Sequence, residues 1–314
     1  MRRAGICYNS LVKLSQLGEF GLIDRLSKKV GKPSKNVKMG IGDDTAVYEP
    51  SAAGFLRKAK YQLITTDTLI ENIHFKLRKT SFQDLGYKAL VINISDIASM
   101  GGYPTHALVT IGANKNILVK KIEDLYRGIS KAANKFKVDI VGGDTVQSPK
   151  ELVVSITLLG EVEKKLLLTR SGAQVGDLIC VTGRFGGPAA EKYVTHYPLP
   201  VPRLKEARQI AKLKIATSMI DSSDGLVRSV MEICRASKVG ARINLGSVPI
   251  AKGAALKQAL YGGEEYELVF TVPKAKKHKY QVVGEITAPR NGIKLVNKRG
   301  KASDPKNGGY EHFK

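Results

Sequence analysis

Cysteine is scarce in this chain. Its 314 residues include only Cys7, Cys180 and Cys234, which are far apart and lack the spacing of a metal site. An odd number of widely spaced cysteines argues against both a disulfide framework and a zinc centre, and it is typical of a reducing compartment. We therefore expect a cytoplasmic protein.

Long hydrophobic runs are also missing. No stretch approaches the roughly 20 apolar residues of a membrane-spanning helix, and residues 1–10 lack the apolar core of a signal peptide. The hydrophobic share of 43% is nevertheless that of an ordinary globular protein. A chain of this length is expected to form two domains, with no membrane partner.

Two nucleotide-binding motifs are absent. Nothing matches G-x-x-x-x-G-K-[ST], and no G-x-G-x-x-G opens a helix after a strand. If the chain uses a nucleotide, it must therefore hold the phosphates through metal ions rather than in a glycine-rich cradle.

Acidic residues are few, 28 against 51 Lys and Arg, which gives a net charge of +23. This charge indicates either nucleic-acid binding or a Lys-rich solvated surface. The basic residues do not alternate with aromatic ones, and no nucleic-acid motif is present. We favour the solvated surface and do not expect a nucleic-acid partner. The alternative, a basic nucleic-acid-associated protein, predicts an affinity that falls steeply with salt.

The stretch 81–103 organises the rest of the chain. Its apolar residues cover more than one face at helical spacing, which predicts a largely buried helix, and Thr80 and Gln83 have capping-box spacing at its start. Asn93 and Asp96 lie inside this run, on one face. A buried carboxylate is costly unless it is paired or binds a metal.

Strand and helix patterns alternate in the first half, which predicts an α/β or α+β fold. The expected helices are 20–30, 81–103, 119–136 and 220–236. The expected strands are 61–66, 107–112, 138–141, 152–160, 178–182, 241–245 and the end of 259–272. A glycine-containing loop at 169–177 predicts a change of domain just before it, which gives residues 1–163 and 164–314.

The aspartates are concentrated in an unusual way. Of thirteen, seven adjoin Gly, Ser or Thr in five stretches without Lys or Arg. The seven are Asp43, Asp44, Asp67, Asp96, Asp144, Asp221 and Asp224. Such stretches supply hard oxygen ligands, which suit Mg²⁺. Because Mg²⁺ usually binds one or two carboxylates plus substrate phosphates, this many carboxylates predicts several ions carrying a polyphosphate.

Each acidic stretch has a simpler explanation, since Gly, Asp, Ser and Thr are also turn formers. Five stretches together favour the metal site. Three other candidate site residues each allow two interpretations. Arg170 is either a clamp on the polyphosphate or a surface residue, His74 either a ligand or structural, and Glu264 either faces a cationic ligand or belongs to a solvated turn.

At these residues the sequence resembles the thiamine-monophosphate kinases, a family within the aminoimidazole-ribonucleotide-synthetase-like (AIR-synthetase-like) group of ATP-using enzymes. The resemblance spans nearly the whole chain. The matching stretches, in order, are GIGDD from Gly40, TTDTLIENIHF from Thr65, YKALVINISDIASMGGYP from Tyr87, GGDTVQSP from Gly142, LTRSGAQVGD from Leu168, IDSSDGL from Ile220, GGEEYEL from Gly262 and GGYEHF from Gly308.

The resemblance implies direct transfer of the γ-phosphoryl group of ATP onto thiamine phosphate, giving thiamine diphosphate. It implies no covalent nucleophile, since metal ions position the reactants and neutralise charge. The implied magnesium ligands are Asp44, Thr65, Thr66, Asp67, Asp96, Asp144 and Asp221, with Asp224 on a further ion. The implied ATP contacts are Gly143, Asp144, Arg170, Ser223 and Tyr126. The implied thiamine phosphate contacts are His74, Glu264 and Tyr310.

The resemblance also implies an N-terminal ATP- and Mg²⁺-binding α/β domain, whose mixed sheet pairs with that of a second subunit, and a C-terminal α+β domain. A homodimer is therefore expected. Two positions depart from the family pattern: Glu265 stands where Asp is usual, and Ser222 where an apolar residue is usual. A sibling enzyme, of the aminoimidazole-ribonucleotide or selenophosphate synthetase type, is the alternative; the latter would need Cys7 as its reactive cysteine, without the expected surroundings.

Overall fold

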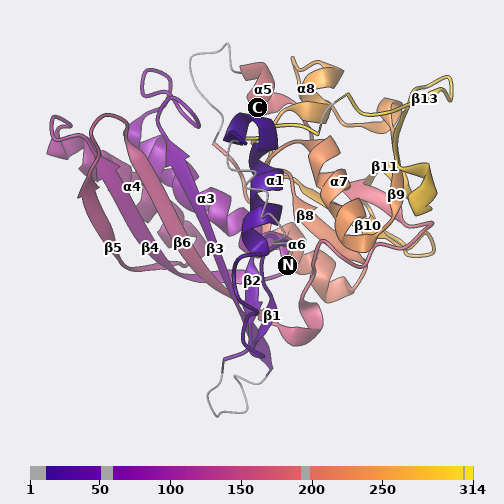
Figure 1. Ribbon diagram of the computed structural model, residues 1–314, viewed down its shortest axis with the longest axis horizontal. Coiled ribbons are helices and arrows are strands. Elements are labelled where there is room, and N and C mark those ends of the chain that lie inside the picture. Colours follow the sequence, from indigo (N-terminus) through magenta and orange to yellow (C-terminus); the bar gives the residue numbers. More distant parts are fainter. Residues whose placement is uncertain (1–11, 51–58, 192–198, 307, 314) are drawn as a thin grey trace, which may run out of the picture.

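Two β-sheets divide the molecule into two lobes that lie side by side (Figure 1). The structure is a computed structural model and describes residues 12–50, 59–191, 199–306 and 308–313. Cys7, which the selenophosphate alternative requires, lies outside the described residues. Among the described helices, none combines the length and the apolar character that crossing a membrane demands.

The first lobe is built on a six-stranded mixed sheet with strand order β1-β2-β3-β6-β4-β5. Neighbouring strands are antiparallel except β4 and β5, which are parallel. The strands are β1 (Val37–Met39), β2 (Ala46–Tyr48), β3 (Lys60–Ile70), β4 (Tyr103–Ala113), β5 (Asp139–Gln147) and β6 (Val153–Glu163). The short 3₁₀ helix η1 (Lys164–Leu166) follows.

The second lobe is built on a seven-stranded sheet with strand order β13-β12-β9-β11-β7-β10-β8, antiparallel except between β9 and β12. Its strands are β7 (Leu178–Val181), β8 (Ser218–Asp221), β9 (Gly240–Asn244), β10 (Leu268–Val272), β11 (Gln281–Thr287), β12 (Ile293–Val296) and β13 (Ala302–Ser303). Its helices are α5 (Gly187–Glu191), α6 (Leu204–Leu213), α7 (Leu226–Ser237) and α8 (Leu256–Tyr261), with 3₁₀ helices η2 (Leu245–Ser247) and η3 (Pro289–Asn291).

Helix α3 (Phe82–Ser99) is the buried helix that the sequence predicts. It packs on β3, β4 and β6 of its own sheet and also contacts α6 and β8 of the second lobe. The capping prediction was wrong by one residue, because Ser81 rather than Thr80 is the N-cap. The Ser81 hydroxyl accepts the Asp84 backbone N–H at 3.0 Å, while the buried Thr80 hydroxyl has no partner.

Helix α4 (Val119–Phe136) has the predicted bounds and lies against α3. The two helices touch at glycines. A Cβ atom on Gly86 would lie 2.0 Å from the Leu125 carbonyl oxygen, and one on Gly128 would lie 1.8 Å from that of Gln83. Only glycine permits this approach of the two backbones.

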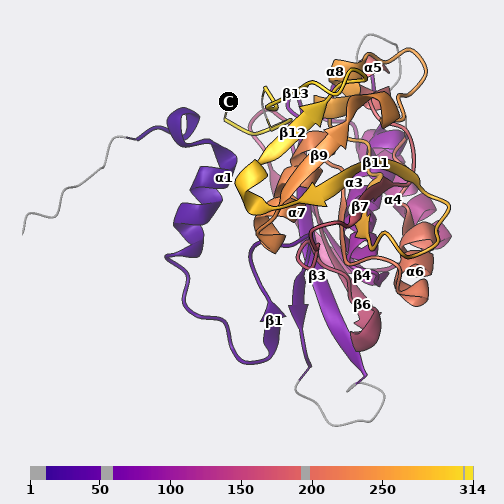
Figure 2. The same cartoon turned by 90° about the vertical axis from the view of Figure 1, so that its right-hand side faces the viewer.

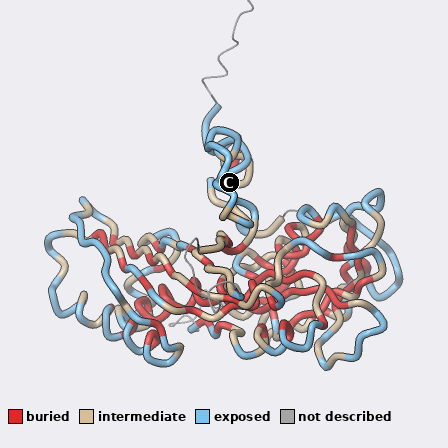
Figure 3. The backbone as a smooth tube through the Cα atoms, turned by 90° about the horizontal axis from the view of Figure 1, so that it is seen from below, coloured by how far each residue is buried: buried red, intermediate tan, exposed pale blue. Residues whose placement is uncertain are grey.

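Helix α1 (Leu14–Ser27) stands off the body of the molecule, close to the C-terminal segment (Figures 2 and 3). It is kinked at Gly18, whose φ of 73° is accessible to glycine at little cost. The Glu19 carboxylate next to this kink accepts the His312 backbone N–H at 3.1 Å. Residues from the two ends of the chain are thereby joined.

One predicted helix starts later than expected. Residues 220–221 end strand β8, where Asp221 pairs with Leu268 of β10, and α7 begins only at Leu226. The elements that were not expected from the sequence include α5, α6, α8, β1, β8 and β11 to β13. The first sheet ends at Glu163 and the second begins at Leu178, and the domain division at 163/164 stays a prediction.

Candidate active site

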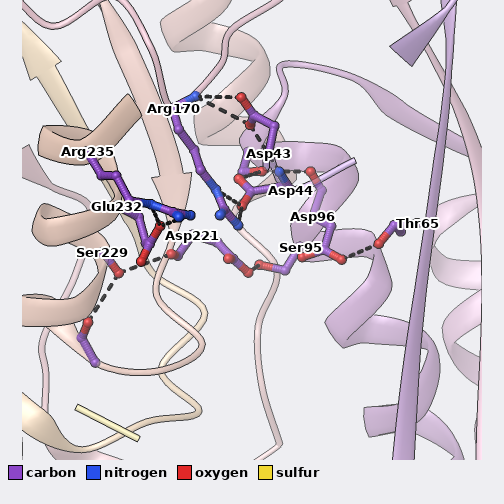
Figure 4. A network of polar contacts seen from close by, with 12 residues as sticks. Asp43, Asp44, Thr65, Ser95, Asp96, Arg170, Asp221, Ser229, Glu232 and Arg235 are labelled. Atoms are coloured by element: carbon purple, nitrogen blue, oxygen red, sulfur yellow. Dashed lines mark hydrogen bonds and ion pairs between the residues drawn. The ribbon is translucent and has the colours of Figure 1, made fainter. Parts of the chain in front are cut away.

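A cluster of carboxylates lies where the two lobes meet (Figure 4). Asp43 and Asp44 come from the turn before β2, Asp96 from α3 and Asp221 from the end of β8. Figure 4 shows these four side chains gathered around Arg170, which precedes the second sheet. Segments distant in sequence are brought together here because α3 packs against both lobes.

Arg170 is the cation bonded to this cluster. Its Nε and Nη2 donate to Asp44 Oδ1 at 2.9 and 2.5 Å, and its backbone N–H donates to Asp43 Oδ2 at 3.1 Å. The sequence left this guanidinium open between a clamp on a polyphosphate and a surface residue, and the resemblance implies a contact with ATP. In the structure it is engaged with Asp44, whose side chain is almost fully buried.

Hydroxyl groups hold the other carboxylates. The Thr65 hydroxyl donates to Asp96 Oδ2 at 2.5 Å, and the Ser95 hydroxyl donates to Asp221 Oδ2 at 2.5 Å. The Ser99 hydroxyl contacts both Asp44 Oδ2 and the Asp96 carbonyl. These bonds orient the carboxylates but supply no positive charge.

Burial and mutual repulsion raise the pKa values of this cluster. Burial, and then the charge of Asp44, raise the pKa of Asp43 to about 7, that of Asp67 to about 6 and that of Asp221 to about 8. Burial raises the pKa of Asp96 well above its usual value, with Asp67 and Asp221 adding to the shift. Full ionisation of the cluster would therefore place more negative charge inside the protein than Arg170 balances.

Mg²⁺ suits this cluster in donor type and charge. The donors are carboxylate and hydroxyl oxygens, and a divalent cation would relieve the repulsion that raises the pKa values. The side chains are not arranged as a finished metal site: in the described ranges no three His, Cys, Asp or Glu side chains converge closely enough to hold an ion.

A cavity of about 370 Å³ opens beside the cluster. Asp67 links the two, because it lines the cavity and its charge also raises the pKa of Asp96. Seven predicted site residues line the cavity: Thr66, Asp67, His74, Ser223, Asp224, Glu264 and Tyr310. Gly263, next to Glu264, also lines it. All three predicted thiamine phosphate contacts are among these residues.

Hydrogen bonds orient His74 on one wall of the cavity. Its Nδ1 accepts the Ile70 backbone N–H at 3.0 Å, so Nε2 carries the proton and faces His312 Nε2 at 3.4 Å. Burial, with His312 and Lys88 nearby, lowers the pKa of His74. His74 is therefore a neutral hydrogen-bond donor.

Three predicted site residues lie elsewhere. Gly143 and Asp144 are on β5, the outer strand of the first sheet on the side away from the second lobe (Figure 1), and Tyr126 is on α4. Asp144 is exposed, and its Oδ1 accepts the Thr145 backbone N–H at 2.8 Å. None of the three lines the cavity or bonds to the carboxylate cluster within the described part of the chain.

Several residues at the cavity were not predicted from the sequence. Glu19, Lys76 and His312 line the cavity, and Lys88 lies behind its wall with its Nζ 2.5 Å from Glu264 Oε1. Lys88 had a detectable signal, since a lysine inside an apolar helix demands a partner. Glu19 had none, because its position depends on a contact with a residue far along the chain. His312 lies in the matching stretch GGYEHF, but no role was assigned to it.

The two lobes correspond to two known domains. Residues 42–162 match the AIR synthase related protein, N-terminal domain, and residues 166–295 match the AIR synthase related protein, C-terminal domain. The fold and the site thus define a two-domain protein of the AIR-synthase-related class.

Similarity within this class is more specific. The chain is 33% identical to the thiamine-monophosphate kinase of Buchnera aphidicola subsp. Schizaphis graminum, over 95% of this chain and 99% of that protein. It is 34% identical to that of Bacillus subtilis, over 82% and 84%. The solved structure of AaThiL complexed with AMPPCP and TMP superposes with a TM-score of 0.82 at 30% identity, over 97% and 100% of the two chains. The chain belongs to the thiamine-monophosphate kinase family.

Proposed function

We propose that this protein phosphorylates thiamine phosphate with ATP to give thiamine diphosphate. The observation that carries the proposal is the cavity that shares Asp67 with a buried carboxylate cluster. The cavity has room for a small organic phosphate, and the cluster suits the metal ions that accompany a nucleoside triphosphate. Family membership favours this reaction over the sibling synthetases.

We propose Mg²⁺ as the resident metal, held by several ligands from both lobes. They are Asp44, Thr65, Thr66, Asp67, Asp96 and Asp221, with Asp224 on a further ion. When bound, the ions would neutralise the charge that keeps two phosphate groups apart. The chain's part is to position the oxygens: Thr65 and Ser95 orient Asp96 and Asp221 through hydrogen bonds of 2.5 Å.

The reactants are proposed to occupy adjoining spaces. Arg170 and Ser223 would contact ATP, with Arg170 anchored by Asp44. His74, Glu264 and Tyr310 would contact thiamine phosphate in the cavity. His74 offers a fixed Nε2–H donor, and the Tyr310 ring suits a cationic heterocycle.

A homodimer is proposed for the outer edge of the first sheet. Strand β5 is exposed along almost its whole length, and Val141 and Val146 are 57% and 48% exposed. An open strand edge with exposed apolar residues favours pairing with another chain. Such pairing would bring Gly143 and Asp144, the proposed ATP and metal contacts, against a second subunit; Tyr126 stays a proposed ATP contact. A cytoplasmic location is proposed from the cysteine usage.

The first test measures ADP and thiamine diphosphate formed from ATP, Mg²⁺ and thiamine phosphate. We expect equal amounts of the two products. Asp67→Asn should lower the rate at least ~10³-fold, because it removes a charged ligand where catalysis depends on positioning. Asp304→Asn is the matched control: Asp304 is exposed, pairs with Lys294 and should be dispensable.

Two outcomes would overturn the proposal. A folded protein that binds Mg·ATP but forms no thiamine diphosphate would indicate a sibling enzyme with another acceptor. Nucleic-acid affinity that falls steeply with salt, without Mg·ATP binding, would favour the nucleic-acid alternative.

A further inference from the structure

The charge balance of the cavity distinguishes its two glutamates. Glu264 is already paired: Lys88 Nζ lies 2.5 Å from its Oε1, and the Lys88 side chain is only 8% exposed. A buried ammonium held this closely neutralises the carboxylate and fixes its orientation. Glu264 is thus an ion-paired acceptor of fixed orientation, and Lys88 offsets part of its charge, which still adds to the rise in the pKa of Tyr310.

Glu19 lines the same cavity from the opposite end of the chain. Its Oε2 accepts the His312 backbone N–H at 3.1 Å, and the ion pairs formed by the described residues do not include it. The other basic residues in the lining are Lys76, His74 and His312, and of these His74 is neutral. Among the described residues, Glu19 therefore lines the cavity without a paired cation.

We infer that Glu19 is the carboxylate that recognises the positive charge of the thiazolium ring, whereas Glu264 contributes a fixed acceptor. This inference rests on the proposed function. A carboxylate stabilises a cation more strongly in a partly enclosed cavity than in open water, because the effective dielectric constant is lower there. Glu19 is thus a specificity-determining residue for a cationic acceptor.

The surroundings of Glu19 support this assignment. After burial, the charge of Glu19 is the largest contribution that raises the pKa of Tyr310 and of Asp224, the latter to about 6. The Glu19 carboxylate therefore interacts electrostatically with both Tyr310 and Asp224 in the cavity wall. The kink at Gly18 and the bond to His312 orient it, and α1 (Figure 3) is further tied to α7 by the Asp24–Arg235 ion pair and by Arg228 over the Phe20 ring.

The test uses Glu19→Gln, which keeps an oxygen acceptor for the His312 N–H and removes only the charge. The binding of thiamine phosphate is measured by calorimetry, alongside an analogue in which a neutral thiophene ring replaces the thiazolium ring. We expect Glu19→Gln to weaken the binding of thiamine phosphate about tenfold and to leave that of the neutral analogue unchanged.

Asp24→Asn is the matched control, because Asp24 lies on the same helix and pairs with Arg235 outside the cavity. It should change neither affinity. Equal weakening of both ligands by Glu19→Gln would show a structural role and overturn the inference, as would unchanged binding of both. If the unaltered protein itself does not bind thiamine phosphate, the proposed function fails instead.

Discussion

Lys88 of α3 and Glu264 of the second lobe join the two lobes through an Nζ–Oε1 contact of 2.5 Å. The lysine is nearly buried, whereas the glutamate side chain is 32% exposed. Because an ammonium left alone inside a protein is costly, each partner depends on the other.

This pair predicts a specific double-mutant result. Lys88→Met should raise the KM for thiamine phosphate and destabilise the protein, because Glu264 loses its orientation. Adding Glu264→Gln should restore part of the stability, with a coupling of about 1–3 kcal/mol. Denaturant unfolding of the four proteins gives this energy. Strict additivity would contradict the pairing.

The glycine contact between α3 and α4 predicts a large loss of stability for Gly86→Ala. Its Cβ would lie 2.0 Å from a backbone carbonyl oxygen, which no side-chain movement can relieve. We expect a loss of about 2–4 kcal/mol in unfolding free energy. Gly31→Ala, which would meet nothing within 4 Å, is the control and should change it by less than ~0.5 kcal/mol. A Gly86→Ala variant as stable as the control would disprove this contact.

Ser222 predicts a stabilising substitution. It is fully buried, and its hydroxyl has no hydrogen-bond partner among the described residues. Ser222→Ala should leave the unfolding free energy unchanged or raise it by up to ~1 kcal/mol. Ser229→Ala is the contrast, since the Ser229 hydroxyl bonds to the Asp221 and Gly225 carbonyls and its removal should cost about 1 kcal/mol. Thermal melting compares the two, and a clear loss for Ser222→Ala would mean that its hydroxyl has a partner in solution.

The carboxylate cluster predicts that the metal-free protein becomes less stable as the pH rises. In the unfolded chain these carboxyl groups have a pKa near ~4. In the folded protein burial raises the pKa of Asp67 to about 6, that of Asp43 to about 7 and that of Asp221 to about 8. The folded state therefore binds more protons over this window, and stability falls between about pH 4 and pH 8.

Added Mg²⁺ should reduce that fall, because it binds the ionised carboxylates and offsets their repulsion. The rise in melting temperature caused by Mg²⁺, relative to EDTA, should be larger at pH 8.5 than at pH 5.5. Equal shifts at both pH values, or a metal-free protein that gains stability between pH 6 and pH 8, would contradict the buried cluster.

Local patterns predicted the parts of the fold that local contacts determine. The apolar periodicity of residues 119–136 gave the bounds of α4, and the apolar run around Asp96 gave the buried helix α3. The last two residues of strand β8, Ile220 and Asp221, were assigned to the start of a helix over 220–236. Their strand state depends on pairing with β10, which lies more than forty residues further along the chain.

The sequence likewise predicted part of the candidate site, namely its carboxylates, but not their partners. The acidic stretches marked Asp44, Asp96 and Asp221, but their apparent lack of neutralising bases was misleading, since Arg170 reaches Asp44 from 126 residues away. The partners of Glu264 and Glu19 were hidden for the same reason. Contacts across such separations leave no periodic signal in the sequence.

The joining of Glu19 to His312, 293 residues apart, has a consequence for synthesis on the ribosome. The first lobe and the carboxylates at the lobe boundary are translated well before residues 308–313. The wall of the cavity formed by Tyr310 and His312 can close only after these last residues emerge. The acceptor cavity of a nascent chain is therefore incomplete until Tyr310 and His312 have been synthesised.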